Sequence, residues 1–346
     1  MSAHVLVVRL DNDGDVLLAG PAIRAVAAGA TRVTLLCGPR GRAAAEVLNG
    51  VDEVLEHRAA WIDPEPEPVE REAILALVED LAARRFDEAF ILTSFHQSPL
   101  PTALLLRLAG VPVVAATSED YAGSLLDVRH RIGDDVHEVE RSLSLVATRG
   151  YRLPEGDDGR LAVTAMPGVG LPAVESPYVV VHPGASVPAR TWPAERHVAL
   201  VDALAAERRR VVVTGTAGEK ALTELVAGPP RAEVLDLGGR TNFAELTSVL
   251  RGAEAVVVGN TGPAHLAAAV GTPVVSLYAP TVPAVRWRPW RVPHALLGDQ
   301  DAPCAGSRAR ICPVRGHPCL SSVGVEDVLA ALETVVAASA CEGVAA

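Results

Sequence analysis

The sequence has few aromatic residues and almost no lysine. Aromatic residues make up 3% of the 346 residues, which disfavours a carbohydrate-binding surface built from stacked rings. Lys220 is the only lysine among the 31 basic residues, and 42 acidic residues leave a net charge of −11. Such an acidic chain is a poor candidate for binding nucleic acid or an anionic membrane surface. The apolar fraction of 49% is that of a globular protein and excludes a chain that is mainly disordered.

The sequence also lacks long apolar runs and closely spaced cysteines. No uninterrupted apolar stretch reaches ~18 residues, so we expect no transmembrane helix, and no secretory signal precedes the first strand-like run. The cysteines are odd in number and thinly spread, at Cys37, Cys304, Cys312, Cys319 and Cys341. The gaps between the middle three are wider than those of ordinary zinc sites, even with His317 nearby, so we expect no metal. These absences predict a soluble cytoplasmic protein with reduced thiols.

A regular alternation of strand-like and helix-like segments is present instead. In the first half we expect strands at 4–10, 32–36, 88–92 and 113–116, and helices at 16–26, 41–48, 70–84 and 100–109. In the second half we expect strands at 178–181, 211–214, 234–237, 255–259 and 274–277, and helices at 194–206, 219–227, 243–251, 264–270 and 325–338. A Gly- and Pro-rich stretch separates the two series, with the linker near 165–177.

This alternation predicts an α/β fold with two doubly wound parallel-sheet domains. We place them at 1–168 and 169–325, followed by a closing helix and tail at 326–346. Ligands of such domains bind beyond the carboxyl ends of the strands, so the space between the two domains is the natural site.

The strongest local signal is the segment 259–265, GNTGPAH, which follows a buried strand and opens a helix. Asn260 or Thr261 can cap this helix, and Pro263 suits its first turn. Free N–H groups at a helix start bind anions, Gly262 lets a phosphate approach the backbone, and His265 lies one turn further on. A capped helix with a packed histidine explains the same residues about equally well.

Two other loops carry weaker signals. In His182-Pro183-Gly184-Ala185-Ser186, small residues after a strand let backbone amides approach an anion, and Arg190 adds a fork of donors for phosphate oxygens. From these residues alone, a turn with an exposed arginine is the favoured interpretation. The segment 215–220, GTAGEK, is too short between its glycines for a phosphate loop. Its Glu219 suits a helix cap, although it could also bind a ribose hydroxyl.

Acidic residues gather in a loop at 11–15, DNDGD. The loop does not match a calcium site, because Gly14 stands at the fourth position and not the sixth. Asp15, near the carboxyl end of the first strand, is well placed for a general base, and the alternative is that it caps the next helix. No Gly-x-Gly-x-x-Gly follows the first strand and no Gly-x-Ser-x-Gly occurs, which disfavours a nicotinamide dehydrogenase and an α/β-hydrolase.

Taken together, three segments resemble glycosyltransferase family 9, the ADP-heptose:lipopolysaccharide heptosyltransferases. They are VLVVRLDNDGDVLLAGPAIRAV, HPGAS with RTWP, and GNTGPAHLAAAVGTPVVSLYAPT, in the family's order and spacing. The resemblance implies a GT-B fold, in which two Rossmann-like domains face each other across a cleft and a C-terminal helix crosses back to the N-terminal domain. It also implies an inverting, metal-independent transfer of a heptose or related sugar from an ADP-sugar. The N-terminal domain would hold the acceptor and the C-terminal domain the nucleotide.

The resemblance also assigns roles to individual residues. Asp15 matches the catalytic base, Arg190 the basic position that binds the diphosphate, and His265 the last residue of the phosphate-binding motif. Asn260 stands where many members carry an aspartate, and it brings no charge to the donor sugar. The implied donor-binding residues are Gly184, Ala185, Ser186, Glu219, Thr241, Asn260, Thr261, Gly262 and Pro263, with Phe243 near the adenine.

The sequence gives weaker signals for the residues that bind the acceptor. Asn12, His96 and Arg129 are expected in loops after N-terminal strands and could meet an acceptor, although solvated loop residues are at least as good an explanation. The acceptor hydroxyl would belong to a glycan, a glycolipid or a small molecule, and a lipid-linked acceptor would bring the protein to a membrane surface.

Other functions stay open beside this one. A GT-B enzyme could use a UDP- or GDP-sugar, as a transferase or an epimerase, and a non-catalytic partner could bind a sugar nucleotide without turnover. The nucleotide sugar is a substrate in the preferred interpretation, so we expect no cofactor.

Overall fold

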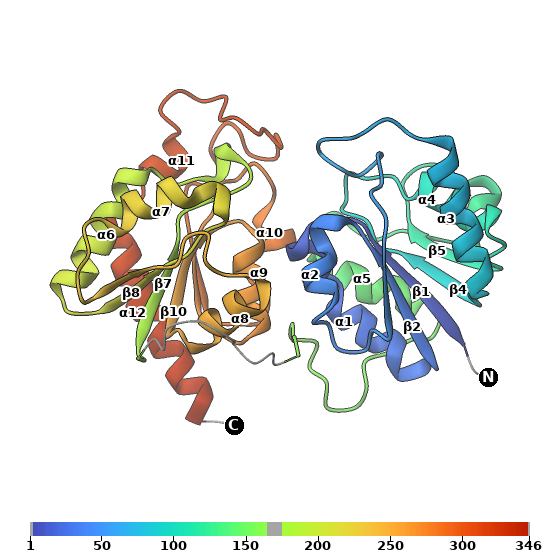
Figure 1. Ribbon diagram of the computed structural model, residues 1–346, viewed down its shortest axis with the longest axis horizontal. Coiled ribbons are helices and arrows are strands. Elements are labelled where there is room, and N and C mark those ends of the chain that lie inside the picture. Colours follow the sequence, from blue (N-terminus) through green and yellow to red (C-terminus); the bar gives the residue numbers. More distant parts are fainter. Residues whose placement is uncertain (1–2, 165–174, 345–346) are drawn as a thin grey trace. The chain divides into compact units, whose positions relative to one another are not determined.

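Each half of the chain folds around one sheet of six parallel strands with helices on both faces (Figure 1). The computed structural model describes residues 3–164 and 175–344, and it divides the chain into unit 1, Met1–Thr164, and unit 2, Ala165–Ala346. The predicted α/β class and the pair of doubly wound domains are confirmed. The expected linker lies largely outside the described residues, and the predicted boundary at 168 stays a prediction.

The sheet of unit 1 has its first strand in the middle. Its spatial order is β3 (Glu53–Glu56), β2 (Arg32–Cys37), β1 (His4–Arg9), β4 (Glu88–Ile91), β5 (Val113–Thr117) and β6 (Val128–His130). The run Val5–Val8 in β1 is fully buried, as a parallel strand covered on both faces requires.

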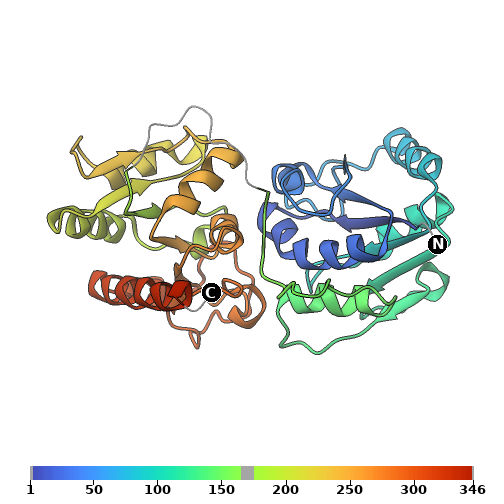
Figure 2. The same ribbon diagram turned by 90° about the horizontal axis from the view of Figure 1, so that it is seen from below.

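Two pairs of helices cover this sheet. The helices α1 (Asp13–Gly29) and α5 (Glu138–Ala147) pack side by side on one face (Figures 1 and 2). The helices α3 (Arg71–Arg84) and α4 (Leu100–Leu108) cover the other face, where Leu81 and Leu106 join the core. The short α2 (Arg42–Ala45) follows β2.

Unit 2 repeats this topology. Its spatial order is β12 (His294–Leu297), β11 (Val274–Leu277), β10 (Ala255–Gly259), β7 (Tyr178–His182), β8 (Arg210–Val213) and β9 (Val234–Asp236). The helices α6 (Ala194–Ala206), α7 (Lys220–Ala227) and α12 (Val325–Val344) share one apolar core with the sheet. The helices α8 (Phe243–Gly252) and α9 (Gly262–Ala269) contact each other and the sheet, and α10 (Ala284–Trp287) and α11 (Pro318–Ser321) are single turns.

The closing helix α12 is longer than expected and packs within unit 2. It contacts β10, β11, β12 and α6, and Figure 2 shows it as one continuous helix. Its further predicted contact with the N-terminal domain stays a prediction. No helix in the described ranges is both long enough and apolar enough to cross a membrane.

Several local expectations were wrong. The segment at 11–15 is not wholly a loop, because α1 begins at Asp13 with Asn12 at the N-cap. The helix expected at 41–48 is confined to α2, after a single 3₁₀ turn. The elements β3, β6, α5, α10, β12 and α11 were not anticipated. The strand β6 shows why, because it is a three-residue, half-buried edge strand with too little apolar pattern to recognise.

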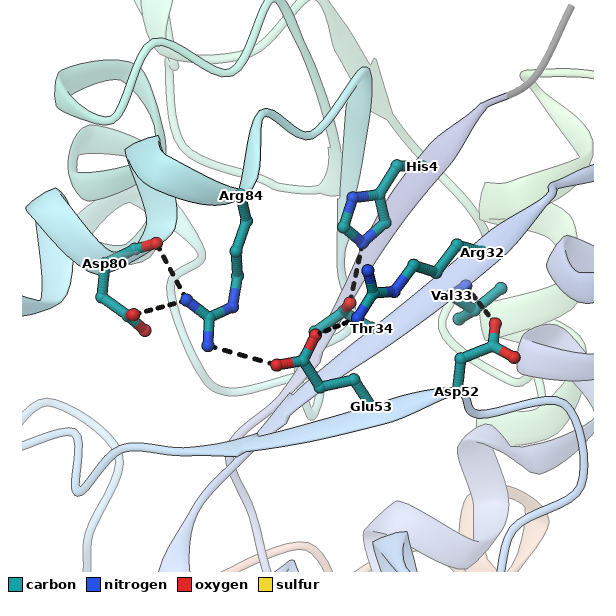
Figure 3. Close-up of polar contacts among 8 residues, drawn as sticks. All are labelled: His4, Arg32, Val33, Thr34, Asp52, Glu53, Asp80 and Arg84. Carbon is teal, nitrogen blue, oxygen red and sulfur yellow. Dashed lines mark hydrogen bonds and ion pairs between the residues drawn. The ribbon is translucent and has the colours of Figure 1, made fainter.

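The amino ends of the unit 1 strands are joined by side-chain contacts (Figure 3). The carboxylate of Glu53 accepts a hydrogen bond from Arg32 Nη2 at 2.8 Å and one from Arg84 Nη2 at 3.2 Å, and His4 Nε2 lies 2.9 Å from Thr34 Oγ1. These contacts stabilise the register of β1, β2 and β3 at the edge opposite to the one where doubly wound sheets bind ligands.

Candidate active site

The predicted donor-binding residues of unit 2 lie on loops at the carboxyl ends of four adjacent strands. Spatially these strands run β10, β7, β8 and β9. Chain order reverses between β7 and β10, because β8 and β9 lie on one side of β7 and β10 on the other. Such a switch point is where doubly wound sheets leave a crevice for a ligand.

Gly184 and Glu219 come together beside β7. A Cβ atom at residue 184 would collide with the Glu219 carboxylate, so only glycine leaves room for it. Glu219 Oε2 accepts hydrogen bonds from Thr216 N–H at 2.8 Å and from Thr216 Oγ1 at 2.9 Å, in a capping box that precedes α7. Glu219 is therefore a helix cap, which was the first of the two roles expected for it. Its carboxylate also faces the loop that follows β7.

The loop that carries Thr241 lies next to the loop that leads to Glu219. Gly239 N–H donates to Gly215 O at 2.9 Å, which joins the ends of β8 and β9. Asn242 then caps α8, and its side chain accepts from Glu245 N–H at 2.9 Å. Thr241 is half-buried between these two anchored points, and Phe243 opens α8.

The turn between β10 and α9 contains buried polar atoms without partners. Thr261 occupies the N-cap position of α9, but its side chain makes no capping hydrogen bond. The expectation that Thr261 caps this helix through its side chain is therefore wrong. Asn260 Nδ2 and Thr261 Oγ1 are both buried and find no hydrogen-bond partner in the described residues. Buried polar groups are normally paired, so these two are available to a ligand at the start of the helix. His265 is 4% exposed, within α9.

Arg190 ends the single 3₁₀ turn Pro188–Arg190. Ala189 anchors this turn, because its N–H donates to Arg310 O at 3.0 Å and its carbonyl lies 3.1 Å from His317 Nε2. The bare backbone of Gly259 lets the Arg190 carbonyl approach, since a Cβ atom there would lie 3.0 Å from it. Burial raises the pKa of Tyr278 and the nearby charge of Arg190 opposes that rise. Arg190 therefore lies by the ends of β10 and β11.

The flanking Trp192 and His197 pack together in the core. Their rings are 4.9 Å apart at 84°, and Trp192 Nε1 donates to Val323 O at 3.2 Å. Burial lowers the pKa of His197 to about 3, with a smaller contribution from His182, so His197 is neutral. Burial also lowers the pKa of His182, whose Nδ1 lies 3.0 Å from Thr214 Oγ1. Both histidines are thus structural, whereas in the loop that follows β7 Ala185 is half-buried and Ser186 is exposed.

In unit 1, Asp15 lies in the first turn of α1 and is held by Arg9, the last residue of β1. Arg9 Nη2 donates to Asp15 Oδ1 at 3.0 Å, and the Asp15 side chain is 21% exposed. Asn12, not Asp15, occupies the N-cap, so the capping alternative for Asp15 is wrong. Burial alone would lower the pKa of Arg9, but the carboxylates of Asp11, Asp15 and Glu138 raise it above its usual value.

Two further acids flank Asp15. Burial raises the pKa of Asp11 to about 6, with Arg9 opposing and Asp15 adding to the rise. Burial likewise raises the pKa of Asp13 to about 6, although Ala44 N–H donates to its Oδ1 at 3.1 Å. Asp11 also accepts a hydrogen bond from Gln97 Nε2.

The three candidate acceptor residues do not form one group. Asn12 and His96 are exposed, after the adjacent strands β1 and β4. Arg129 lies on the edge strand β6, which β4 and β5 separate from β1, and its guanidinium donates to the carbonyls of Ser118 and Glu119. Arg129 is therefore engaged in holding the end of β5 and is not brought to Asp15.

The sequence interpretation missed Arg9, Ser94 and Gln97 around Asp15. The available signal was a charged residue at the end of an otherwise apolar strand, HVLVVR, immediately before acidic residues. A buried arginine needs carboxylate partners, so this juxtaposition predicts an ion-pair cluster.

No group of three or more His, Cys, Asp or Glu in the described part of the chain could hold a metal ion. The cysteines Cys37, Cys304, Cys312, Cys319 and Cys341 are all free.

Comparison with known proteins identifies the family. The model of glycosyltransferase family 9 (heptosyltransferase) matches residues 74–316, which is more than half of the chain. This chain belongs to glycosyltransferase family 9. The match includes the predicted donor-binding residues of unit 2, and it begins after Asp15.

Curated relatives agree with the family but match in part. Lipopolysaccharide heptosyltransferase 3 of Escherichia coli is 31% identical over 47% of this chain and 48% of its own length. Lipopolysaccharide heptosyltransferase 1 of Pseudomonas aeruginosa is 32% identical over 62% of this chain and 61% of its own length. The chain therefore spans 48% and 61% of the length of these two relatives.

Solved structures extend the likeness in fold to nearly the whole chain. The E. coli ADP-heptose LPS heptosyltransferase II has a TM-score of 0.72 at 20% identity, with 97% of this chain and 98% of that chain covered. The E. coli heptosyltransferase WaaC with ADP-2-deoxy-2-fluoro heptose has a TM-score of 0.71 at 24% identity, with 95% and 99% covered. The GT-B fold expected from the sequence is confirmed.

Proposed function

We propose that this protein is an inverting glycosyltransferase that moves a heptose, or a related sugar, from an ADP-sugar to an acceptor hydroxyl. The observation that carries the proposal is the turn before α9, where Asn260 Nδ2 and Thr261 Oγ1 are buried and have no hydrogen-bond partner among residues 3–164 and 175–344. Family membership supports the sugar transfer, and a relative solved with ADP supports the nucleotide.

The donor would lie along the carboxyl edge of the unit 2 sheet. Thr241 and Phe243, beyond β9, would flank the adenine, and Glu219 would bind a ribose hydroxyl through the carboxylate oxygen that does not cap the helix. The diphosphate would lie at the switch point between β7 and β10. There it would meet the amides of Gly184, Ala185 and Ser186, the guanidinium of Arg190, and the turn Asn260–Pro263 with His265 behind it.

The chemistry would be a single displacement. Asp15 would accept the proton of the acceptor hydroxyl as its oxygen attacks the anomeric carbon, while the bond from that carbon to the diphosphate breaks. One displacement inverts the configuration at that carbon. The departing ADP gains negative charge, which Arg190 and the first amides of α9 would stabilise in the transition state.

Metal independence is part of the proposal and is supported by how the charges of unit 1 are paired. The guanidinium of Arg9 lies 2.9 Å from Asp11 Oδ2 and 3.0 Å from Asp15 Oδ1, so an internal cation already partners these carboxylates. In unit 2, Arg190 would supply the positive charge that a leaving diphosphate requires.

The acceptor would be held by unit 1, close to Asp15 and Asn12. The curated relatives' names refer to lipopolysaccharide, so we propose a glycan or glycolipid acceptor of that class. A lipid-linked acceptor would bring the protein to the surface of a membrane. Exclusion of water from the bound substrates would limit hydrolysis of the donor.

The test is calorimetry with ADP, UDP and GDP in the presence of a chelator, followed by transfer from ADP-heptose. Selective binding of ADP without a metal, together with transfer, supports the proposal. Preference for UDP or GDP would replace the donor class and keep the fold. Binding of ADP-heptose without transfer to any lipopolysaccharide-type acceptor would favour a non-catalytic partner.

A further inference from the structure

One buried arginine connects four segments of unit 1. Arg9 is 1% exposed at the end of β1. Its Nε lies 2.9 Å from Asp11 Oδ2, its Nη2 3.0 Å from Asp15 Oδ1, and its Nη1 3.6 Å from Glu138 Oε2. Nη2 also donates to Ser94 Oγ at 2.9 Å. These partners belong to the β1–α1 loop, the first turn of α1, the start of α5 and the loop after β4.

This arrangement spans the switch point of the unit 1 sheet. The strands β1 and β4 are adjacent, and the segments that follow them leave the sheet in different directions. Ser94 N–H donates to Gln97 Oε1 at 3.1 Å, and Gln97 Nε2 donates to Asp11, so the loop after β4 is tied to the same cluster. The guanidinium therefore fixes the start of α1 relative to that loop.

The three carboxylates differ in exposure. The side chain of Glu138 is 1% exposed and that of Asp11 is 8%, whereas that of Asp15 is 21% exposed. Arg9 contacts Asp15 through Oδ1, so Oδ2 is the oxygen that remains for a ligand. Asp15 is thus the member of the cluster that can reach a substrate.

We propose that Arg9 is the positioning residue of the proposed base: it anchors Asp15 Oδ1 so that Oδ2 faces the acceptor hydroxyl. The inference rests on the proposed function and goes beyond it, because Arg9 touches neither substrate. Asp11 and Glu138 are the other charged groups that face Arg9 in this cluster.

The geometry requires an arginine and not merely a positive charge. Arg9 Nη2 donates to Asp15 Oδ1 and Ser94 Oγ, while Nε and Nη1 form ion pairs with Asp11 at 2.9 Å and Glu138 at 3.6 Å. A lysine ammonium cannot make these contacts from one point. Arg9→Lys therefore keeps a cation in the cluster and loses the fork. Arg9→Met loses both.

Arg24 offers a matched control in the same unit. Its Nε donates to Asp157 Oδ2 at 2.7 Å and its Nη2 to Asp157 Oδ1 at 2.9 Å, and its side chain is 14% exposed. Arg24→Lys and Arg24→Met break a comparable ion pair, and neither residue of that pair contacts Arg9 or Asp15 in the structure. The Arg24 variants therefore report what loss of an ion pair in unit 1 does by itself, and thermal unfolding compares the destabilisation in the two series.

The experiment measures transfer from ADP-heptose as a function of pH, with ADP affinity and thermal unfolding for every variant. We expect Arg9→Lys to lower kcat by roughly 10- to 100-fold, the scale of a misplaced catalytic group, while ADP affinity changes less than about 2-fold. In Arg9→Met the acidic limb of the pH–rate profile should also move to higher pH, because a carboxylate without its cation is harder to keep ionised. The Arg24 variants should keep the wild-type profile.

The outcomes separate the two claims. A wild-type kcat and pH profile in Arg9→Lys would overturn the positioning role, as would an equal loss in Arg24→Lys. If Arg9→Met does not fold, the comparison of the two lysine variants still decides. No transfer by the wild-type protein from any ADP-sugar would remove the proposed function and the inference with it.

Discussion

The Glu219 carboxylate occupies the space that a side chain at Gly184 would need. A Cβ atom built at residue 184 collides with this carboxylate, which is itself fixed by two hydrogen bonds from Thr216. The loops after β7 and β8 are therefore matched to each other, because a side chain at residue 184 would require the Glu219 carboxylate to move. If Glu219 binds the ribose, the absence of a side chain at residue 184 is a condition for binding.

Gly184→Ala should weaken ADP binding about 10-fold, because the added methyl displaces the Glu219 carboxylate and the complex loses a hydrogen bond worth about 1–1.5 kcal/mol. Calorimetry measures the change. Gly133→Ala is the control, since a Cβ atom there would meet nothing within 4 Å. Unchanged ADP affinity in Gly184→Ala, with the fold intact, would show that Glu219 is not a nucleotide contact.

Arg190→Ala should weaken ADP by about 10- to 100-fold and leave adenosine almost unaffected. Charge-assisted hydrogen bonds are each worth about 1.5–3 kcal/mol, and only the diphosphate can accept them. Calorimetry with both ligands checks this. Arg196→Ala removes an exposed arginine from α6 and should change neither affinity. An equal loss for ADP and adenosine would place Arg190 away from the diphosphate.

Asp15→Asn should leave ADP binding intact and lower transfer by at least about 100-fold, because an amide cannot accept the hydroxyl proton. Asp13→Asn is the control from the same turn of α1. Asp13 accepts a hydrogen bond from Ala44 N–H, and an amide oxygen can still do so. Turnover of Asp15→Asn at the wild-type rate would reject Asp15 as the base.

Thr261→Val should weaken ADP without destabilising the free protein. The Thr261 hydroxyl is buried and has no hydrogen-bond partner in the part of the chain that the structure describes, so its removal costs no hydrogen bond there unless a ligand is bound. Thr272→Val is the converse, because Thr272 Oγ1 donates to Leu250 O at 2.7 Å. It should lower the free energy of unfolding by about 1 kcal/mol and leave ADP binding unchanged. A stability loss in Thr261→Val would show that its hydroxyl is already paired.

The strands and their carboxyl-end loops could be predicted because their signals are local. The run AVVVG followed by NTGPAH contains a buried strand, a glycine turn and a helix start in one segment, and β10 and α9 lie there. The donor-binding loops follow such strands. Because the carboxyl ends of parallel strands lie at one edge of a sheet, the order of strands and loops in the sequence already predicts that these loops share that edge.

The missed features depend on contacts between distant segments. Glu138 was not recognised because its partner Arg9 is far away in the sequence and no local pattern joins them. Arg129 was expected near an acceptor because it follows a strand, but its strand is at the sheet edge and its donors are taken by nearby carbonyls. Local patterns do not reveal such pairings.

The last prediction concerns the buried His197, whose pKa burial lowers to about 3. An unfolded histidine gains a proton near pH 6.5 and the folded one does not, so its contribution to stability is present above pH 6.5 and is lost as the pH falls toward 3. Between pH 6.5 and pH 5 this amounts to about 2 kcal/mol.

His197→Phe should therefore flatten the fall in stability at acid pH, since the ring keeps its packing against Trp192 and no longer titrates. Urea unfolding followed by tryptophan fluorescence reports mainly on unit 2, which contains Trp192, Trp287 and Trp290. His182 is present in both proteins, so the difference between the two curves reports His197 together with its smaller interaction with His182. Parallel curves for wild type and variant from pH 7.5 to pH 5 would mean that His197 binds its proton equally well in the folded and unfolded chain.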